Sequence, residues 1–146
     1  RRHTRFRNVT GVQTCALPIS EQMLNYSKLV RNTADIYALA INLYECLTKE
    51  PPFIGNNPEI LMHLMLNQPL EKKGNVDGAL ASIIEKATAR GQFGLPPAQM
   101  TDEDIERKLG EGIAARYQQI SEFKNALANY LINFQLNKKK SFFSKW

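Results

Sequence analysis

A helix with apolar residues on nearly every side dominates the hydrophobic pattern of this chain. It occupies most of the segment Thr33–Phe53 and ends before Pro51 and Pro52, because proline lacks the amide that a helix needs. Its apolar residues form two neighbouring faces, one of Ile36, Ala40, Leu43 and Leu47 and one of Tyr37, Ile41 and Tyr44. A surface helix has a single apolar stripe, so we expect this one to be the central helix of a globular domain. Asn42 and Glu45 interrupt the run too often for a membrane span, which needs about 20 mostly apolar residues.

Four further helices are indicated by start signals followed by amphipathic stripes. They are a helix that starts at Asn57 and stops before Pro69, one from Asp77 through Thr88, a short one from Thr101 that Gly110 and Gly112 end, and a last one capped by Ser121. The last helix is expected to bury Phe123, Leu127, Tyr130, Leu131 and Phe134. Asn32 and Thr33 are the expected capping residues of the central helix. No segment alternates apolar and polar residues over two-residue steps, so the sequence predicts an all-α fold.

Four motifs resemble one family when they are taken in chain order. They are D-I-Y-A-L-x-x-x-L-Y-E-x-L-T-x-x-x-P-P-F from Asp35, N-P-E-I-L at Asn57–Leu61, I-I-E-K-A-T at Ile83–Thr88 and R-Y-Q-x-I-S-E-F at Arg116–Phe123. Each motif alone is weak, but together they resemble the helical C-terminal lobe of bacterial-type serine/threonine protein kinases. The resemblance covers most of Glu21–Leu131. It implies a partial C-terminal lobe over residues 21–136, truncated before the central helix.

Three residues match structural positions of that family. The resemblance implies that Asp35 accepts amide bonds from the kinase catalytic loop, whereas its position alone indicates only a carboxylate favoured by the helix dipole. Glu21 resembles the last residue of the kinase A-P-E segment, and Arg116 resembles the arginine that pairs with it. The resemblance therefore implies a buried bidentate ion pair between Glu21 and Arg116. Taken alone, each residue indicates only an ordinary surface charge. None of the three is a catalytic, cofactor or metal residue.

Two departures from the family pattern lie within the matched region. Ala40 stands where the family usually has glycine. Between Ala89 and Ala115 the family has a short D-P turn, whereas this chain has a longer segment with a helix of its own. The longer segment is interpreted as a tolerated insertion, since long loops add little entropic cost, and the alternative is a partner surface.

Residues 1–20 do not fit the kinase pattern. Val9–Ile19 reads V-T-G-V-Q-T-C-A-L-P-I, which is the translation of a common short-read sequencing adapter, and R-R-H-T-R at the start fits the other end of the same oligonucleotide. We interpret residues 1–20 as translated adapter sequence and exclude them from fold reasoning. The alternative is a basic N-terminal arm or a transit peptide.

The positive charge of the chain belongs to its two ends. The chain carries 19 basic and 14 acidic residues, a net charge of +5, which invites a nucleic-acid hypothesis. Removing the four arginines of residues 1–20 and the four lysines of the tail leaves a net charge of −3 between Glu21 and Asn137. No nucleic-acid-binding motif accompanies the charge, so nucleic acid is rejected as a partner. Among the remaining residues, His63 and Cys46 are isolated, which indicates a helix-surface histidine and a buried apolar cysteine rather than a metal site.

The motifs that transfer phosphate are absent from the chain. A protein kinase needs a glycine-rich loop, a paired lysine, the H-R-D-x-x-x-x-N loop and the D-F-G metal aspartate. In kinase order all of them precede Glu21, where the adapter segment joins. We therefore predict that this chain binds no ATP, whereas a full-length parent uses ATP and Mg²⁺ to phosphorylate serine or threonine in protein substrates. The alternatives are a pseudokinase-like interaction module and an unrelated helical bundle.

The tail 137–146 interleaves lysines with aromatic residues, in the order N-K-K-K-S-F-F-S-K-W. In the receptor-like members of the kinase family that the chain resembles, such a segment commonly precedes a membrane span, and basic clusters favour the cytoplasmic side. The two interpretations are a juxtamembrane tether and a solvated terminus. The chain shows no secretory signal, and we expect a cytoplasmic location.

Overall fold

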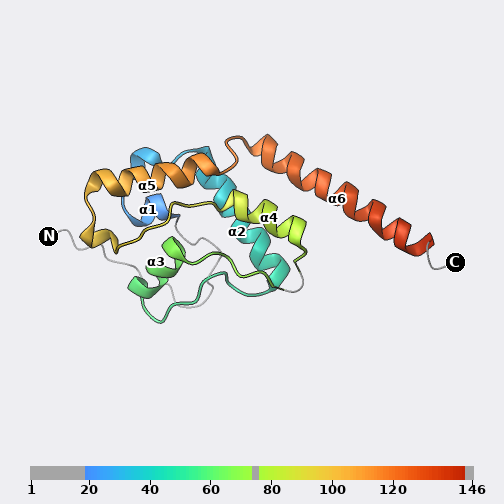
Figure 1. The fold of residues 1–146 in the computed structure, drawn as a ribbon, viewed down its shortest axis with the longest axis horizontal. Coiled ribbons are helices and arrows are strands. Elements are labelled where there is room, and N and C mark those ends of the chain that lie inside the picture. The colour runs from blue at the N-terminus through green and yellow to red at the C-terminus, as the bar shows by residue number, and fades with distance from the viewer. Residues whose placement is uncertain (1–18, 74–75, 144–146) are drawn as a thin grey trace.

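The protein is all-helical in a computed structural model that describes residues 19–73 and 76–143 (Figure 1). The helices are α1 (Ser20–Met23), α2 (Asn32–Thr48), α3 (Pro58–Asn67), α4 (Gly78–Ala87), α5 (Asp102–Ala115) and α6 (Ile120–Phe143), with short 3-10 turns η1 (Ser27–Leu29) and η2 (Pro97–Gln99). No strand occurs in these residues. The predicted all-α class is therefore confirmed.

The central helix α2 covers the predicted residues but is not capped as predicted. Arg31 is its N-cap and makes no side-chain capping bond. The Thr33 side chain, expected to accept an amide, is buried instead, and its hydroxyl has no hydrogen-bond partner among the described residues. The helix ends at Thr48, before the two prolines, as predicted. At this end Lys49 adopts the left-handed conformation (φ 62°) and donates its amide to the Glu45 carbonyl at 2.8 Å.

The starts of α3 and α4 confirm two predicted caps. The Asn57 side chain accepts the Ile60 amide at 2.7 Å, and Pro58 occupies the first helical position. The Asp77 carboxylate accepts the amides of Ala79 and Leu80 at 2.9 and 3.0 Å. In each case one side-chain oxygen satisfies amides that the helix leaves free.

Helix α5 runs past the two glycines that were expected to end it. Its start is as predicted, since the Thr101 hydroxyl accepts the Asp104 amide at 3.2 Å. Gly112 is a contact residue rather than a stop, because a Cβ there would lie 2.5 Å from the Arg90 Cα, and the backbone of Gly91 is equally close. The backbone of α5 at Gly112 therefore touches the backbone of the turn after α4, and only a residue without a Cβ allows the two to come so close.

Helix α6 differs from its prediction at both ends. The Glu122 side chain, rather than Ser121, reaches back to accept the Gln118 amide at 2.9 Å. Phe123 is buried as predicted, with Leu127 and Tyr130 partly buried beside it, but Leu131 and Phe134 are 55% and 51% exposed. The helix leaves the body of the domain before these residues are covered (Figure 1).

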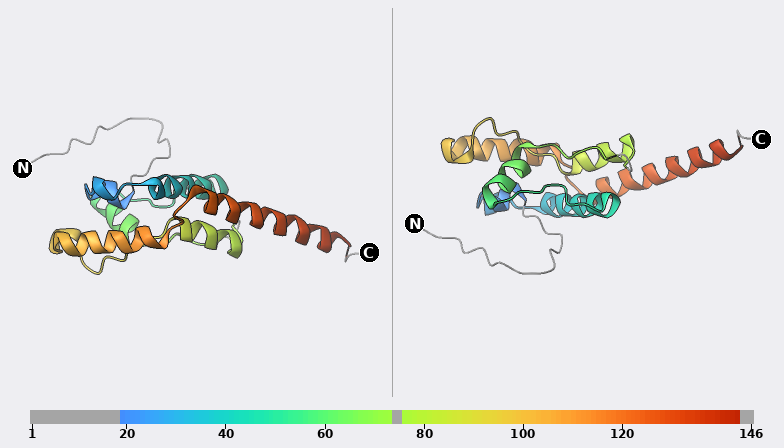
Figure 2. Two further views of the ribbon diagram at one scale, coloured as in Figure 1. Left: turned by 90° about the horizontal axis from the view of Figure 1, so that it is seen from above. Right: turned by 90° about the horizontal axis from the view of Figure 1, so that it is seen from below.

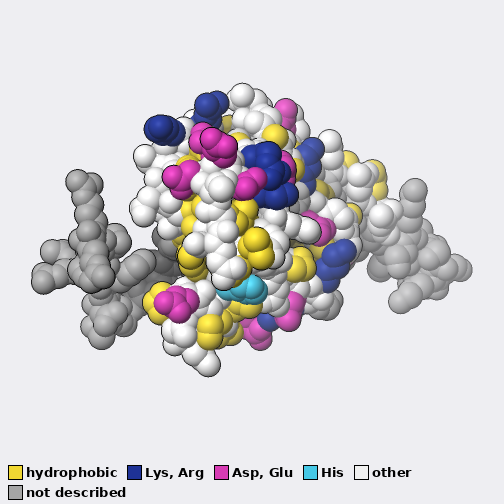
Figure 3. All heavy atoms as spheres, turned by 60° about the vertical axis from the view of Figure 1, so that its left-hand side comes forward, with side chains coloured by type: hydrophobic (Ala, Val, Ile, Leu, Met, Phe, Trp, Pro, Cys, Tyr) yellow, Lys and Arg dark blue, Asp and Glu magenta, His cyan; other side chains and the backbone are white. Residues whose placement is uncertain are grey.

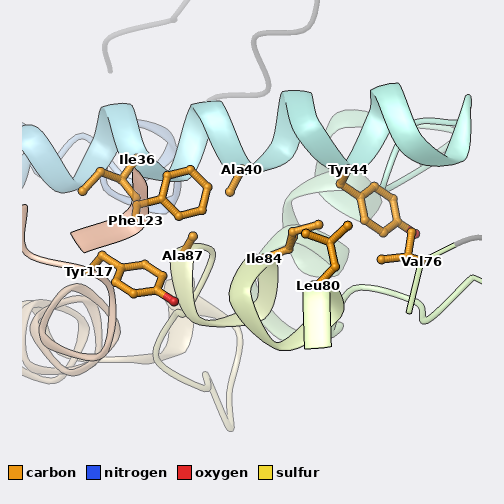
Figure 4. Packing of buried hydrophobic residues seen from close by; sticks show 9 residues of the cluster. All are labelled: Ile36, Ala40, Tyr44, Val76, Leu80, Ile84, Ala87, Tyr117 and Phe123. Atoms are coloured by element: carbon orange, nitrogen blue, oxygen red, sulfur yellow. The ribbon is translucent and has the colours of Figure 1, made fainter. Parts of the chain in front are cut away.

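The helices form two layers, with α1 and α2 in one and α4 and α5 in the other (Figure 2). Helix α2 packs against α4, and both pack against α6. The main core lies at this junction, where Ile36, Ala40 and Tyr44 of α2 face Leu80, Ile84 and Ala87 of α4, with Tyr117 and Phe123 closing one end (Figure 4). A second cluster of Leu66, Phe93, Ile105 and Leu109 joins α3 to α5.

The far side of α2 is less covered than the apolar pattern predicted. Leu39 is 49% exposed, and Cys46, expected to be buried, is exposed as a free thiol. Ile36, Tyr37, Ala40 and Ile41 are fully buried, so the covered part of the helix is the side that faces α4 and the segment before α2. Within the described residues, no helix is long and apolar enough to cross a membrane.

Candidate functional site

A fully buried ion pair joins Glu21 and Arg116, which are 95 positions apart in the sequence. Arg116 donates from Nη1 to Glu21 Oε1 at 2.7 Å and from Nη2 to Glu21 Oε2 at 3.3 Å. The side chains are 1% and 0% exposed, so neither charge reaches water. The contact is the bidentate ion pair implied by the kinase resemblance, in the geometry that gives an arginine and a carboxylate their strongest interaction.

Two further hydrogen bonds complete the surroundings of this pair. The Ser20 hydroxyl donates to Glu21 Oε2 at 2.6 Å, and Arg116 donates from Nε to the Ala89 carbonyl at 2.7 Å. Arg116 therefore links the start of α1, the turn after α4 and the segment between α5 and α6. A single guanidinium thus connects three parts of the chain that lie far apart in sequence.

Tyr37 and Arg90 lie next to the ion pair. The Arg116 guanidinium stacks over the Tyr37 ring at 5.0 Å from its centroid. Burial raises the pKa of the Tyr37 hydroxyl, while the charges of Arg90 and Arg116 oppose that rise. Burial also lowers the pKa of the Arg90 guanidinium, although a neutral arginine remains out of reach in proteins. The site therefore concentrates two cationic side chains around a single buried carboxylate and one phenol.

The Arg90 side chain caps the C-terminal end of α3. It donates to the Met65 carbonyl at 2.7 Å and to the Gln68 carbonyl, and its guanidinium lies 5.0 Å from the centre of the Phe53 ring. The last carbonyls of a helix carry partial negative charge and attract a cation. Arg90 and Arg116 together therefore hold α3, the turn after α4 and the Glu21 segment in one arrangement.

This arrangement is a structural clamp. The Glu21 carboxylate accepts three hydrogen bonds from its own chain and is fully buried, so no substrate in solvent can reach it to give up a proton. The pair is sealed from solvent, and its bonds are made to other parts of the same chain. Its physical effect is to fix the segment before α2 against the segment before α6.

Asp35 lies apart from the clamp. It occupies the first turn of α2 and is exposed, and no donor among the described residues reaches its carboxylate. The structure therefore brings Glu21 and Arg116 together but leaves the third predicted residue alone. Its observed environment is that of a carboxylate at a helix N-terminus, stabilised by the free amides there. The role implied by the kinase resemblance stays a prediction.

Sequence reasoning missed Tyr37 and Arg90 as members of the site. Tyr37 was assigned to an apolar face of the central helix. Arg90 was assigned only to the longer segment between Ala89 and Ala115. One available signal was the pair of glycines at 91 and 112, since glycine often marks a close backbone approach. That approach brings Arg90 and Arg116 to the same end of the domain.

The structure describes only part of the termini to which separate origins or roles were assigned. Of the residues interpreted as adapter sequence, 1–18 lie outside the described residues, while Ile19 and Ser20 are buried next to Glu21. Ile19 packs with Ala34, Tyr37 and Ile41. In the tail, residues 144–146 also lie outside the described part.

Surface charges on α5 are paired with each other. Arg107 contacts Asp104 at 2.7 Å and Glu111 at 3.0 Å, and the hydrogen bond from Arg107 holds the pKa of Asp104 below its usual value. On the face drawn in Figure 3, acidic and basic side chains are interspersed. No three His, Cys, Asp or Glu side chains of the described residues gather closely enough to hold a metal ion.

No protein-family model matches the sequence, and no curated protein matches it. The buried pair of Glu21 and Arg116, together with the order of the four motifs, is therefore the ground on which a function can be assigned. The family of the chain stays a proposal.

Proposed function

We propose that the chain is part of the C-terminal lobe of a serine/threonine protein kinase, a transferase that moves the γ-phosphate of ATP to protein hydroxyls. The observation that carries the proposal is the buried bidentate contact between Glu21 and Arg116. The kinase resemblance implies the same contact, because Glu21 matches the end of the A-P-E segment and Arg116 matches the arginine that pairs with it. A chance resemblance in an unrelated bundle gives no reason for two charges 95 residues apart to meet without solvent.

In this proposal the clamp holds the end of the activation segment. Glu21 lies within α1, and Arg116 directly follows α5, so their contact fixes the chain that leads into α2. The stretch N-terminal to Glu21 would then be anchored at one end on a rigid helical body. α3 and its neighbours would contribute to the side of the lobe that faces protein substrates.

The present chain is proposed to be inactive. It holds neither the glycine-rich loop nor the H-R-D and D-F-G motifs, so no residue positions ATP, Mg²⁺ or the attacking hydroxyl. The proposal places those motifs in a parent chain, N-terminal to Glu21. ATP and Mg²⁺ are therefore cofactors of the parent, and its partners are protein substrates.

An adapter-free sequencing read across the codon for Glu21, followed by a phosphotransfer assay, tests the proposal. We expect H-R-D and D-F-G in frame upstream, transfer of labelled phosphate to serine or threonine by the complete protein, and none by the present chain. An aspartate-to-asparagine change in the newly read H-R-D motif is the control and should abolish transfer. An upstream frame without those aspartates would support a pseudokinase-like docking module, and one unrelated to kinases would refute the proposal.

A further inference from the structure

The second half of α6 exposes apolar side chains that the rest of the domain does not cover. Leu131, Ile132, Phe134 and Leu136 are each 50–56% exposed, whereas Phe123, nearer the start of the same helix, is 4% exposed. The last described contact with the body is at Tyr130, which donates from its hydroxyl to Asp77. Beyond it the helix projects away from the other helices (Figures 1 and 2).

A four-residue repeat organises this half of the helix. Asparagine recurs at positions 125, 129, 133 and 137, and the residues between are mainly apolar, as in N-Y-L-I at 129–132 and N-F-Q-L at 133–136. Since each helical residue is rotated by about 100° from the last, a four-residue repeat keeps the asparagines on one side of the helix. Of the exposed apolar residues, Leu131 and Phe134 lie on the opposite side, whereas Ile132 lies at the edge of the asparagine side and Leu136 within it. The side that carries Leu131 and Phe134 is therefore the one suited to an apolar medium.

The charge of the same segment is entirely positive. No acidic residue follows Glu122, while lysines stand at 138, 139, 140 and 145 and are interleaved with Phe142, Phe143 and Trp146. The backbone of α6 remains helical to Phe143, so the three consecutive lysines belong to the same helix as the exposed apolar residues. Basic residues next to apolar and aromatic ones are the composition of helices that lie in the interface of a bilayer.

We infer that α6 from Leu131 onward binds the surface of an anionic lipid bilayer. The apolar side chains would enter the boundary between headgroups and acyl chains, and the lysines would contact lipid phosphates and carboxylates. The asparagine side would face water. Lipid binding of this kind is independent of the proposed kinase activity, and it does not require a membrane span.

A second copy of the chain fits this surface less well. The exposed apolar stretch Leu131–Leu136 extends over roughly 9 Å of helix, whereas a stable interface buries roughly 800 Å² on each partner. Such a short stretch supplies a small part of that area. A bilayer needs no complementary protein surface, and negative lipid charge complements the lysines.

Vesicle flotation with the full chain tests the inference, because bound protein floats while aggregated protein sediments. Phosphatidylcholine vesicles are compared with vesicles that contain phosphatidylserine. Trp146 is the only tryptophan, so its fluorescence reports the tail directly. We expect flotation and a blue shift of the emission with the anionic vesicles only, both weakened by added salt.

Three variants separate the contributions. Changing Lys138, Lys139 and Lys140 to Gln should weaken binding about 100-fold, at about fivefold for each charge near the surface. A matched variant with Lys28, Lys49 and Lys72 changed to Gln loses the same charge from exposed positions of the body and should bind normally. Leu131→Gln with Phe134→Gln should remove the blue shift.

The N-terminal arginines need their own control. A variant with Arg1, Arg2, Arg5 and Arg7 changed to Gln must still float with anionic vesicles. The inference is overturned if that variant no longer binds, if neutral vesicles bind equally, or if the body-lysine variant loses as much binding as the tail variant. A lipid-independent dimer that Leu131→Gln dissociates would assign the surface to a second copy instead.

Discussion

The buried ion pair of Glu21 and Arg116 allows a quantitative test of what holds the domain together. In Arg116→Met the Glu21 carboxylate keeps a single hydrogen bond, from the Ser20 hydroxyl, and remains fully buried. Breaking a buried pair by removing one partner costs about 3–5 kcal/mol, because the other charge stays uncompensated. For a domain whose total stability is about 5–15 kcal/mol, such a change removes between about a fifth and all of that stability.

Urea unfolding followed by helical circular dichroism measures this cost. With a denaturant slope of about 2 kcal/mol/M, a loss of 3–5 kcal/mol lowers the urea midpoint by about 1.5–2.5 M. Glu21→Leu should have an effect of similar size. The double variant Glu21→Leu/Arg116→Met removes both charges and should lose less than the sum of the single variants, by at least about 1 kcal/mol.

A solvent-exposed arginine supplies the comparison for this measurement. Arg107 also contacts two carboxylates, but its side chain is 56% exposed, so Arg107→Met should leave the midpoint nearly unchanged. The reasoning is refuted if Arg116→Met behaves like Arg107→Met, or if the effects of Glu21→Leu and Arg116→Met simply add. Either result would mean that the pair is not desolvated and coupled as the structure shows.

Three further predictions concern the helices. Gly112→Ala should destabilise the domain by about 1–3 kcal/mol through its clash with the turn after α4, whereas Gly110→Ala, which meets nothing within 4 Å, should stabilise it by up to about 1 kcal/mol; equal urea midpoints would contradict the close approach. Asn57→Ala should cost about 1 kcal/mol through the lost α3 cap, and an unchanged melting temperature would show that the cap is not formed. The hydrogen bond from Tyr130, with those from the α4 amides, holds the pKa of Asp77 below 3.8, so its contribution to stability is present above that pH and is lost as pH falls through the lowered pKa. Urea midpoints between pH 2 and 6 should therefore fall less steeply in Asp77→Asn.

Local signals were enough to place most helices. Asn57 with Pro58 and Asp77 cap α3 and α4 as expected, because a side-chain oxygen two or three residues before an amide can satisfy it without help from the rest of the fold. The prolines after α2 also end the helix through a local effect, since the missing amide hydrogen is that of the proline itself. The all-α class follows from these signals and from the absence of two-residue alternation.

Burial could be predicted only in part, because periodicity shows that a face is apolar and does not show what covers it. Leu131 and Phe134 continue the stripe of Phe123, yet they extend past the body of the domain and stay exposed. Cys46 lies on the central helix α2, which is apolar on nearly every side, and it is nevertheless exposed. The resulting surface on α6 could be found only once the length of the body was known.

Most helix positions in this protein follow from the sequence, because caps, prolines and apolar spacing act within a few residues. Tertiary structure alone decided that Gly112 is a contact residue rather than a helix stop, since the close approach comes from a turn about 20 residues away. It also decided that Glu21 and Arg116 are buried partners rather than surface charges, a contact that the motif resemblance implied but that no local pattern could specify. Local hydrogen bonds are encoded by neighbours in sequence, whereas desolvation of a charge depends on every segment that packs around it.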